Sequence, residues 1–293
     1  MRIFIVTDLE GVSGVLDSET WCHSDSRYYE QAKDLLTREV NAAVEGFVAG
    51  GADDVLICDG HGCGAINPAI LHPAARVDRN WSEGAAYPVH LDRDFAGIAW
   101  VGQHPKAGTV GGHLCHTGSF GVRDLAINGL SVGEFGQMAL CAGELGVPVI
   151  LACGCEAFCR EAQQLAPGIE VAAVKRGTQT EPGHHLPEHA YEKHNTGAID
   201  LSPEEARRRI RVAAQRAVER LRTEKFPLVT LKPPFEQVIV FRSDDLNPPR
   251  VCRKRHDRSV AGMLNQPWVL DPLTAYDPMQ LMPRAPKSSK RGK

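Results

Sequence analysis

The sequence lacks the marks of several classes of protein. In its 293 residues no apolar run approaches the ~18 that a membrane-spanning helix needs, so we expect no membrane partner. We also expect no signal peptide, because Met1 leads directly into a short apolar segment that charged residues soon follow. Internal repeats are absent, which argues against a repeat protein. The Gly-rich stretch 108–118 lacks a Gly-Lys-Ser/Thr ending, which argues against a phosphate-binding loop.

Nothing in the cysteine pattern indicates disulfide pairing. The nine cysteines are an odd number, and several fall in apolar runs. Without a signal peptide, this predicts a cytoplasmic protein with reduced thiols. Cys153 and Cys155, with Cys159 nearby, could suggest a thiolate metal site. A fourth ligand at the usual spacing is missing, so free thiols are favoured.

Charge is unevenly spread along the chain. The net charge of −3 combines an acidic part, with 13 Lys+Arg against 26 Asp+Glu in residues 1–200, and a basic part, with 20 against 10 in residues 201–293. A basic region can bind nucleic acid. Here the arginines fall largely on one amphipathic helix or in the terminal tail, and no recognition motif accompanies them. We therefore expect no nucleic-acid partner, and a solvated or subunit-contacting basic face.

Short apolar segments alternate with helical periodicity along most of the chain. The apolar runs predict core strands at 3–6, 54–59, 97–102, 147–152 and 171–174. Apolar stripes predict helices at 29–49, 134–145, 156–165 and 203–222. A further short helix is expected near 65–71, whereas 12–28 and 176–200 read as irregular. This pattern predicts an α/β fold with a doubly wound, mostly parallel sheet and a smaller C-terminal α+β part.

Three regions are expected along the chain. Residues 1–200 would form the α/β metal-binding catalytic domain, with a hairpin at Asn128-Gly129. Residues 201–276 would form a helix capped by Ser202 and a small β-rich part, with strands at 228–231, 238–241, 251 and 268–270. Residues 277–293, rich in Pro, Ser, Lys and Arg, are expected to be a disordered basic tail.

Potential metal ligands stand at the ends of the predicted strands. Asp8 and Glu10 follow the first strand at strand spacing, so both point to the same side of the chain. His61 and His104 follow two further strands, and Glu134 opens a helix. The carboxyl ends of parallel strands meet at one edge of a sheet, so these residues can converge.

Two imidazoles and three carboxylates suit Zn²⁺, or Mn²⁺ or Co²⁺ with less selectivity. A two-metal hydrolytic site is therefore feasible. Two simpler interpretations stay open. The acids could cap a loop or pair with Arg or Lys, and each histidine alone could be merely hydrogen-bonded or exposed.

The chain resembles the M55 metallopeptidase family of D-aminopeptidases over about residues 1–225. Asp8, Glu10 and Gly11 match the family's opening signature, although Val6 stands where the family has serine. Further matches follow in the same order: Asp59-Gly-His61, Gly102-Gln-His104, Phe120-Gly-Val-Arg123, Val132-Gly-Glu134, Ala172-Ala-Val-Lys175 and Leu201-Ser-Pro203.

The resemblance implies a zinc pair held by a specific set of ligands, with Asp8 bridging: Asp8, Glu10, His61, His104 and Glu134. It also implies that His116 acts on the substrate, as general acid and base or as nucleophile. We favour acid–base catalysis, because a metal-activated water makes a histidine nucleophile unnecessary. His113 is a rival for this role, and Asp59 is expected to orient a ligand histidine.

The expected function is hydrolysis of short peptides, with possible N-terminal D-residues, by a homo-oligomer that the resemblance suggests could be a decamer. Two alternatives stay open: a metal-dependent amidase acting on a non-peptide substrate, and a non-catalytic small-molecule binding protein. The stretch 176–200 looks longer than in the family and is His-rich, although a polar loop is favoured there over a metal site.

Overall fold

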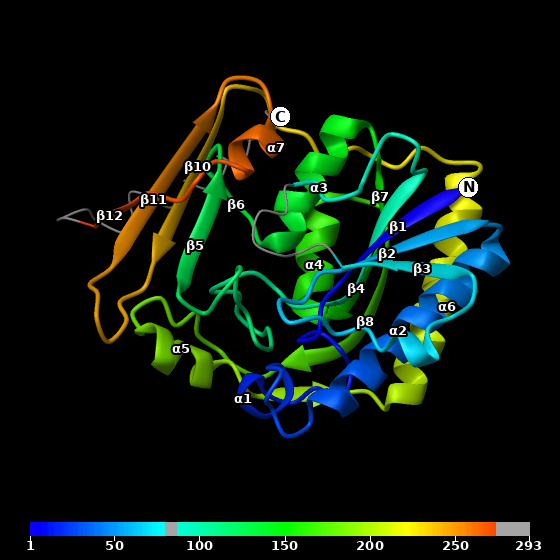
Figure 1. The fold of residues 1–293 in the computed structure, drawn as a ribbon, viewed down its shortest axis with the longest axis horizontal. Helices are drawn as coiled ribbons and strands as arrows, with labels where there is room; N and C mark the ends of the chain where they lie inside the picture. Colours follow the sequence, from blue (N-terminus) through cyan, green and yellow to red (C-terminus); the bar gives the residue numbers. More distant parts are fainter. Residues whose placement is uncertain (80–86, 274–293) are drawn as a thin grey trace, which may run out of the picture.

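A seven-stranded sheet forms the centre of the computed structural model, which describes residues 1–79 and 87–273 (Figure 1). Its strands lie in the order β3 (Ala75–Asp78), β2 (Asp54–Asp59), β1 (Arg2–Thr7), β4 (Gly97–Gln103), β7 (Val149–Cys155), β8 (Glu170–Gly177) and β9 (Ala198–Asp200). All neighbours run parallel except β8 and β9. The strands β1, β4 and β7 are buried almost throughout, because helices cover both faces of the sheet.

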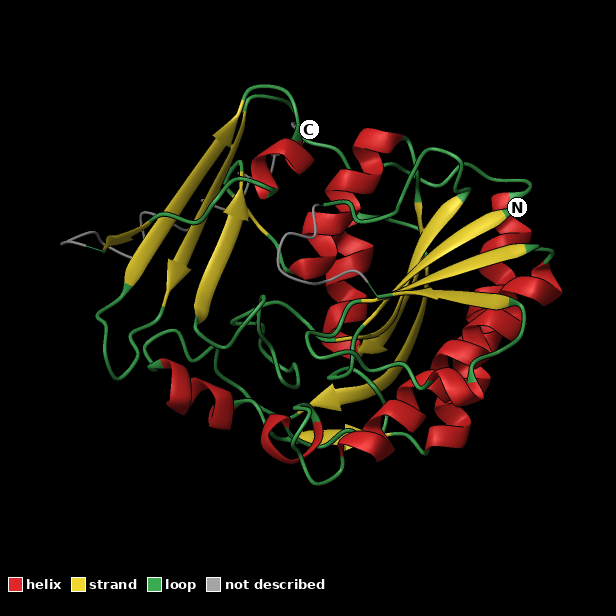
Figure 2. Ribbon diagram, viewed as in Figure 1, coloured by secondary structure: helices red, strands yellow, loops and turns green. Residues whose placement is uncertain are grey.

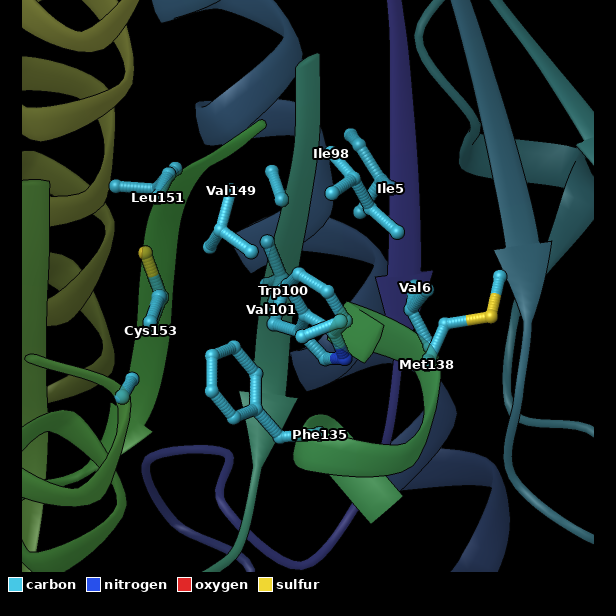
Figure 3. Packing of buried hydrophobic residues seen from close by; sticks show 14 of the residues in the cluster. Ile5, Val6, Ile98, Trp100, Val101, Phe135, Met138, Val149, Leu151 and Cys153 are labelled. Carbon is cyan, nitrogen blue, oxygen red and sulfur yellow. The ribbon is translucent and has the colours of Figure 1, made fainter. Parts of the chain in front are cut away.

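One face of this sheet is covered by α2 (Tyr29–Gly50) and α6 (Pro203–Leu221), which pack against each other. The other face is covered by α3 (Glu134–Leu145) and α4 (Glu156–Leu165), where Trp100 of β4 meets Phe135 of α3 edge-to-face, with ring centroids 4.6 Å apart (Figure 3). The predicted doubly wound, mostly parallel sheet is therefore confirmed. So is the cap of α6, where the Ser202 hydroxyl accepts a hydrogen bond from the Glu205 N–H at 3.3 Å.

A second, antiparallel sheet lies beside α3 and α4, which separate it from the first sheet (Figure 2). Its order is β12 (Leu270–Pro272), β11 (Arg250–His256), β10 (Phe235–Phe241), β5 (Val122–Ile127) and β6 (Leu130–Ser131). This sheet contains strands from both sides of residue 200, because β5 of the predicted hairpin at Asn128-Gly129 pairs with β10. The division into domains at residue 200 stays a prediction, and the predicted tail 277–293 lies outside the described residues.

Several short elements differ from the sequence prediction. Residues 12–28 include α1 (Ser18–Trp21), and the irregular stretch 176–200 contains α5 (Glu188–His194) as well as β9. The predicted helix near 65–71 is a single 3₁₀ turn, η1 (Pro68–Ile70), and α7 (Val260–Leu264) was not predicted. The strand predicted at 228–231 is wrong. Its apolar character has another cause: Val229 is buried, and its carbonyl lies against Gly143 of α3.

The strand order places a topological switch point between β1 and β4. From β1 the chain proceeds outward to β2 and β3, then returns to β4 and continues on the opposite side to β7 and β8. Ligands of open α/β sheets bind in the crevice at such a point, beyond the carboxyl ends of the strands. In the described part of the chain, no helix is both long and apolar enough to span a membrane.

Candidate active site

The five predicted metal ligands converge at this switch point. Asp8 and Glu10 follow β1, His61 follows β2 and His104 follows β4, while Glu134 is the first residue of α3. Asp8, Glu10 and His104 are buried, and the other two are partly buried. Residues separated by up to 126 positions in the sequence thus form one polar cluster at the edge of the sheet.

The Asp8 carboxylate lies at the centre of the cluster, between two imidazoles. Its Oδ1 is 3.1 Å from His61 Nδ1, and its Oδ2 is 3.0 Å from His104 Nε2. Glu10 Oε2 lies 3.4 Å from the same nitrogen of His61, and Glu134 Oε1 lies 3.5 Å from that of His104. The cluster therefore has two halves that share one carboxylate.

Backbone carbonyls hold the outer nitrogen of each histidine. His61 Nε2–H donates to Cys22 O at 2.7 Å, and His104 Nδ1–H donates to Pro105 O at 2.9 Å. A histidine held in this way presents the lone pair of its other nitrogen to the cluster in its neutral form, as metal-binding histidines do.

This donor set fits a divalent metal. Glu10 Oε2 and His104 Nε2 are buried and make no hydrogen bond with any described residue. Leaving a buried polar atom unsatisfied costs about 1–3 kcal/mol. Donor atoms of Asp8, Glu10 and His104 all lie within 4.8 Å of one another, as do those of His104, His116 and Glu134. Nitrogen and carboxylate ligands of this kind suit Zn²⁺, Mn²⁺ or Co²⁺.

Without a metal, protons must neutralise the cluster. Burial lowers the pKa of His61, but the charge of Glu10 and the hydrogen bond with Asp8 raise it well above its ordinary value. Burial likewise raises the pKa of Glu134, yet the neighbouring His104 lowers it to about 2. A divalent cation would replace these protons, so metal affinity should fall as the pH is lowered.

Of the two candidate catalytic histidines, only His116 faces this cluster. Its Nε2 is 3.8 Å from Glu134 Oε1, and its Nδ1–H donates to Leu114 O at 2.8 Å. His113 is fully buried, with Nε2–H donating to Leu16 O at 3.0 Å and Nδ1 accepting from Lys175 Nζ at 3.2 Å. Burial and the charge of Lys175 lower the pKa of His113 to about 3.

Two buried residues with contacts to the cluster have no role in the sequence prediction. Gln103 Nε2 donates to Asp8 Oδ2 at 2.8 Å, and Lys175 Nζ donates to the carbonyl of Glu10 at 3.3 Å and to that of Val15 at 2.5 Å. The sequence contains one signal that could have identified both residues as part of the site: each is a polar side chain near the end of an apolar strand.

Asp59 is tied to the loop that carries His61. Its carboxylate accepts from the N–H groups of Ala65 at 3.0 Å and Ile66 at 3.3 Å, and lies 3.4 Å from Arg79 Nη1. In the described structure the direct anchor of His61 is the Cys22 carbonyl. Asp59 can therefore orient His61 through the loop, without a direct hydrogen bond to its ring.

The cluster opens into a cavity of about 600 Å³. Its polar lining includes Asp8, Glu10, His61, His116 and Glu134, and its apolar lining includes Val6, Tyr87, Trp100, Phe120 and Met138. Glu188 and Glu192 of α5 also belong to the polar lining. All nine cysteines are free; Cys22 and Cys63 also line the cavity, whereas Cys153 and Cys155 are buried and are not part of its lining.

The model of the M55 peptidase family, described as D-aminopeptidase, matches residues 1–247. The chain belongs to the M55 peptidase family. The resemblance predicted from the motifs is thus confirmed, and it extends beyond residue 225. The D-aminopeptidase of Bacillus subtilis strain 168 is 33% identical over 177 residues, which cover 60% of this chain and 64% of the relative. The matched region therefore spans just under two thirds of that relative's length.

The fold of this M55 family member also matches a solved structure. The Zn-dependent D-aminopeptidase DppA from Bacillus subtilis, described as a self-compartmentalizing protease, superposes with a TM-score of 0.77 and 25% sequence identity. The match covers 90% of this chain and 95% of DppA. Both sheets of the protein thus belong to an arrangement that a known peptidase shares.

Proposed function

We propose that the protein is a zinc-dependent aminopeptidase that hydrolyses short peptides, including peptides with an N-terminal D-residue. The observation that carries this proposal is the Asp8 carboxylate between His61 and His104, with Glu10 and Glu134 completing two halves of one buried cluster. Membership of the M55 family and the similarity in sequence and in fold to D-aminopeptidase of Bacillus subtilis support the reaction and the class of substrate.

The cluster would hold two Zn²⁺ ions per subunit. Asp8 would bridge them, with Glu10 and His61 on one side and His104 and Glu134 on the other; Mn²⁺ or Co²⁺ could replace zinc. Bound zinc would polarise the scissile carbonyl and activate the attacking water. The unsatisfied Glu10 Oε2 and His104 Nε2 would become ligands, which removes the energetic penalty of their burial.

His116 is the residue to which we assign proton transfer. Its Nδ1–H is held by the Leu114 carbonyl, so Nε2 is the atom free to accept a proton from the attacking water and to donate one to the leaving amine. It lines the cavity, as a residue that touches substrate must. The alternative His113 is buried and hydrogen-bonded on both nitrogens.

The proposal extends to the assembly and the cellular location of the protein. We propose a homo-oligomer, because the similar DppA is described as self-compartmentalizing, and a decamer as its size, which the family resemblance suggests. We also propose a cytoplasmic location, which suits a chain whose nine cysteines are all free.

The test is hydrolysis of a panel of L- and D-amino-acid amides and dipeptides, with metal content measured on the same samples. Wild-type protein should lose hydrolysis after treatment with a chelator and recover it when Zn²⁺ is returned. Hydrolysis that persists in protein shown to contain no metal would contradict the proposal. A zinc-loaded protein that cleaves no member of the panel would instead favour an amidase with another substrate, or a binding protein.

A further inference from the structure

Helix α5 brings two glutamates into the lining of the cavity. Glu188 and Glu192 are four residues apart, so their side chains leave α5 on the same face. Both are partly buried, and both line the cavity that Asp8, Glu10 and His116 also line. Within the described residues neither glutamate forms an ion pair or a side-chain hydrogen bond. The cavity therefore contains two carboxylates that the metal cluster does not use.

The nearby cation, Arg242, is partly engaged, through one of its guanidinium nitrogens and through the ring of Tyr191. Arg242 Nη1 donates to the carbonyls of Gly183 at 2.7 Å and Leu186 at 3.0 Å, and its guanidinium lies 3.5 Å from the ring centre of Tyr191. These contacts fasten Arg242 to the segment that carries α5. The charge of Glu188 acts on Arg242, but no ion pair joins Arg242 to either glutamate, so both carboxylates can still attract a second cation from the cavity.

Helix α5 is held in a fixed position relative to His116. Tyr191 is fully buried, and its hydroxyl accepts a hydrogen bond from the Gly108 N–H at 2.7 Å. Its ring meets Phe120 edge-on at 6.4 Å, and Phe120 lies 4.7 Å from the ring of His116. An aromatic chain thus connects α5 to the proposed catalytic residue.

The Glu188 carboxylate lies against Gly121. A Cβ atom added at Gly121 would lie 2.9 Å from Glu188 Oε2 and 3.0 Å from its Cδ, closer than carbon and carboxylate normally approach. Glycine at position 121 therefore leaves the space that the carboxylate occupies, beside Phe120 and the cavity.

Different groups of lining residues fit different parts of one ligand. Glu10 lines the cavity, and its Oε2 is buried without a hydrogen-bond partner among the described residues. This part of the lining therefore fits the metal. The lining also contains the carboxylates of Glu188 and Glu192, which form no ion pair with a described residue, and the apolar side chains of Val6, Trp100 and Met138. A ligand that fits this lining has a polar bond to be cleaved, an apolar side chain and a positive charge. The N-terminal residue of a peptide has all three.

We propose that Glu188 and Glu192 bind the α-ammonium group of the substrate and so restrict the enzyme to peptides with a free N-terminus. An ammonium group offers three N–H donors, which two carboxylates can accept. This inference rests on the proposed peptidase function and names the part of the substrate that the site recognises.

The test compares an amine probe with its neutral counterpart. Phenylalaninol, as each enantiomer, has an ammonium group and no amide bond; 3-phenylpropan-1-ol lacks only the amine. Calorimetry would give Kd for both, with zinc-loaded and metal-free protein. In a Glu188→Gln, Glu192→Gln double variant we expect Kd for the better-bound enantiomer to rise about tenfold, which corresponds to about 1.4 kcal/mol. The affinity for the alcohol should stay unchanged.

Glu181→Gln is the matched control, because Glu181 lies on the same segment, is exposed and does not line the cavity. It should leave both affinities unchanged, and thermal unfolding should show that all variants fold. With peptide substrates, the double variant should raise KM about tenfold and leave kcat nearly unchanged.

The outcomes separate this assignment from the proposed function. An amine affinity that is the same in wild type and double variant, or no measurable amine binding by wild type, would overturn the assignment and leave peptide hydrolysis standing. Amine binding that depends on the glutamates, in a zinc-loaded protein that cleaves no peptide, would support the assignment and overturn the peptidase function.

Discussion

The imidazole rings of His104 and His116 lie stacked, with centroids 3.8 Å apart and planes inclined by 16°. Phe120 lies 4.7 Å from His116 and further restricts its ring. Since His104 is anchored by the backbone of Pro105, the stack sets the position of His116 relative to the metal cluster. A proton-transferring residue that must keep its Nε2 beside the substrate benefits from such a fixed ring.

Replacement of His116 should separate metal binding from catalysis. We expect His116→Ala to keep its zinc, because Asp8, His104 and Glu134 remain, and to lose about 10²–10⁴-fold in kcat, the usual contribution of general acid–base catalysis. Elemental analysis and steady-state kinetics measure the two effects, and His185→Ala, at an exposed position, serves as control. Unchanged turnover would transfer the role to His113 or to the metal centre alone.

Replacement of one ligand should empty one half of the cluster. His61 lies with Glu10 on one side of Asp8, and Glu134 lies with His104 on the other. We expect His61→Ala and Glu134→Ala each to lower the zinc content from about two ions per chain to about one, since zinc sites need three or four protein ligands. Elemental analysis of dialysed protein measures this. Wild-type content in either variant would refute its ligand assignment, and His185→Ala should retain full occupancy.

Gly11 keeps the two ligand-bearing loops in contact. Its N–H donates to Gly102 O at 2.8 Å, and a Cβ at position 11 would lie 2.1 Å from the carbonyl oxygen of Gln103. Gly11→Ala must therefore push the loop after β1 away from the end of β4, which separates Asp8 from His104. Overpacking of this kind costs about 1–3 kcal/mol, so the free energy of unfolding should fall by that amount.

The matched control for Gly11→Ala is Gly62→Ala, because an added Cβ at Gly62 meets no atom within 4 Å. Denaturant titration and zinc analysis would compare the two variants. If Gly11→Ala retained wild-type stability and zinc content, contact between the loops would not be what holds the two halves of the cluster together.

Buried Glu39 should make stability depend on pH. Burial raises the pKa of its carboxyl from 4.5 to about 8, although the Ser13 N–H and Lys175 oppose the shift. The folded protein binds this proton more tightly than the unfolded chain does. Its stabilising effect is thus complete below about pH 4.5 and is lost as the pH rises to about 8.

Glu39→Gln removes this titration. Between about pH 5 and 8 the free energy of unfolding of wild type should fall, relative to the variant, by up to about 1.4 kcal/mol per pH unit. Denaturant titrations in the presence of chelator, at several pH values, measure the difference. Parallel pH profiles for the two proteins would show that Glu39 does not titrate in this range.

The predicted core strands and long helices were correct because their signals are local. An apolar run such as 3–6 followed by acids, or a helix closed by Gly51, is visible in neighbouring residues alone. The short elements were missed for the same reason. Helix α5 has seven residues and no apolar stripe, and it is stabilised by Tyr191 and Arg242 through contacts with distant segments.

The parallel sheet and the ligand types at its strand ends could be predicted from the sequence, because hydrophobic periodicity and residue chemistry are properties of the chain. Three features emerge only in the folded protein: Asp8 lies between two imidazoles, His116 rather than His113 faces them, and Glu188 and Glu192 reach the same cavity. These are distances between residues far apart in the chain. They depend on how strands and loops pack, through contacts such as that of Gly11 with Gly102, and no spacing along the sequence encodes them.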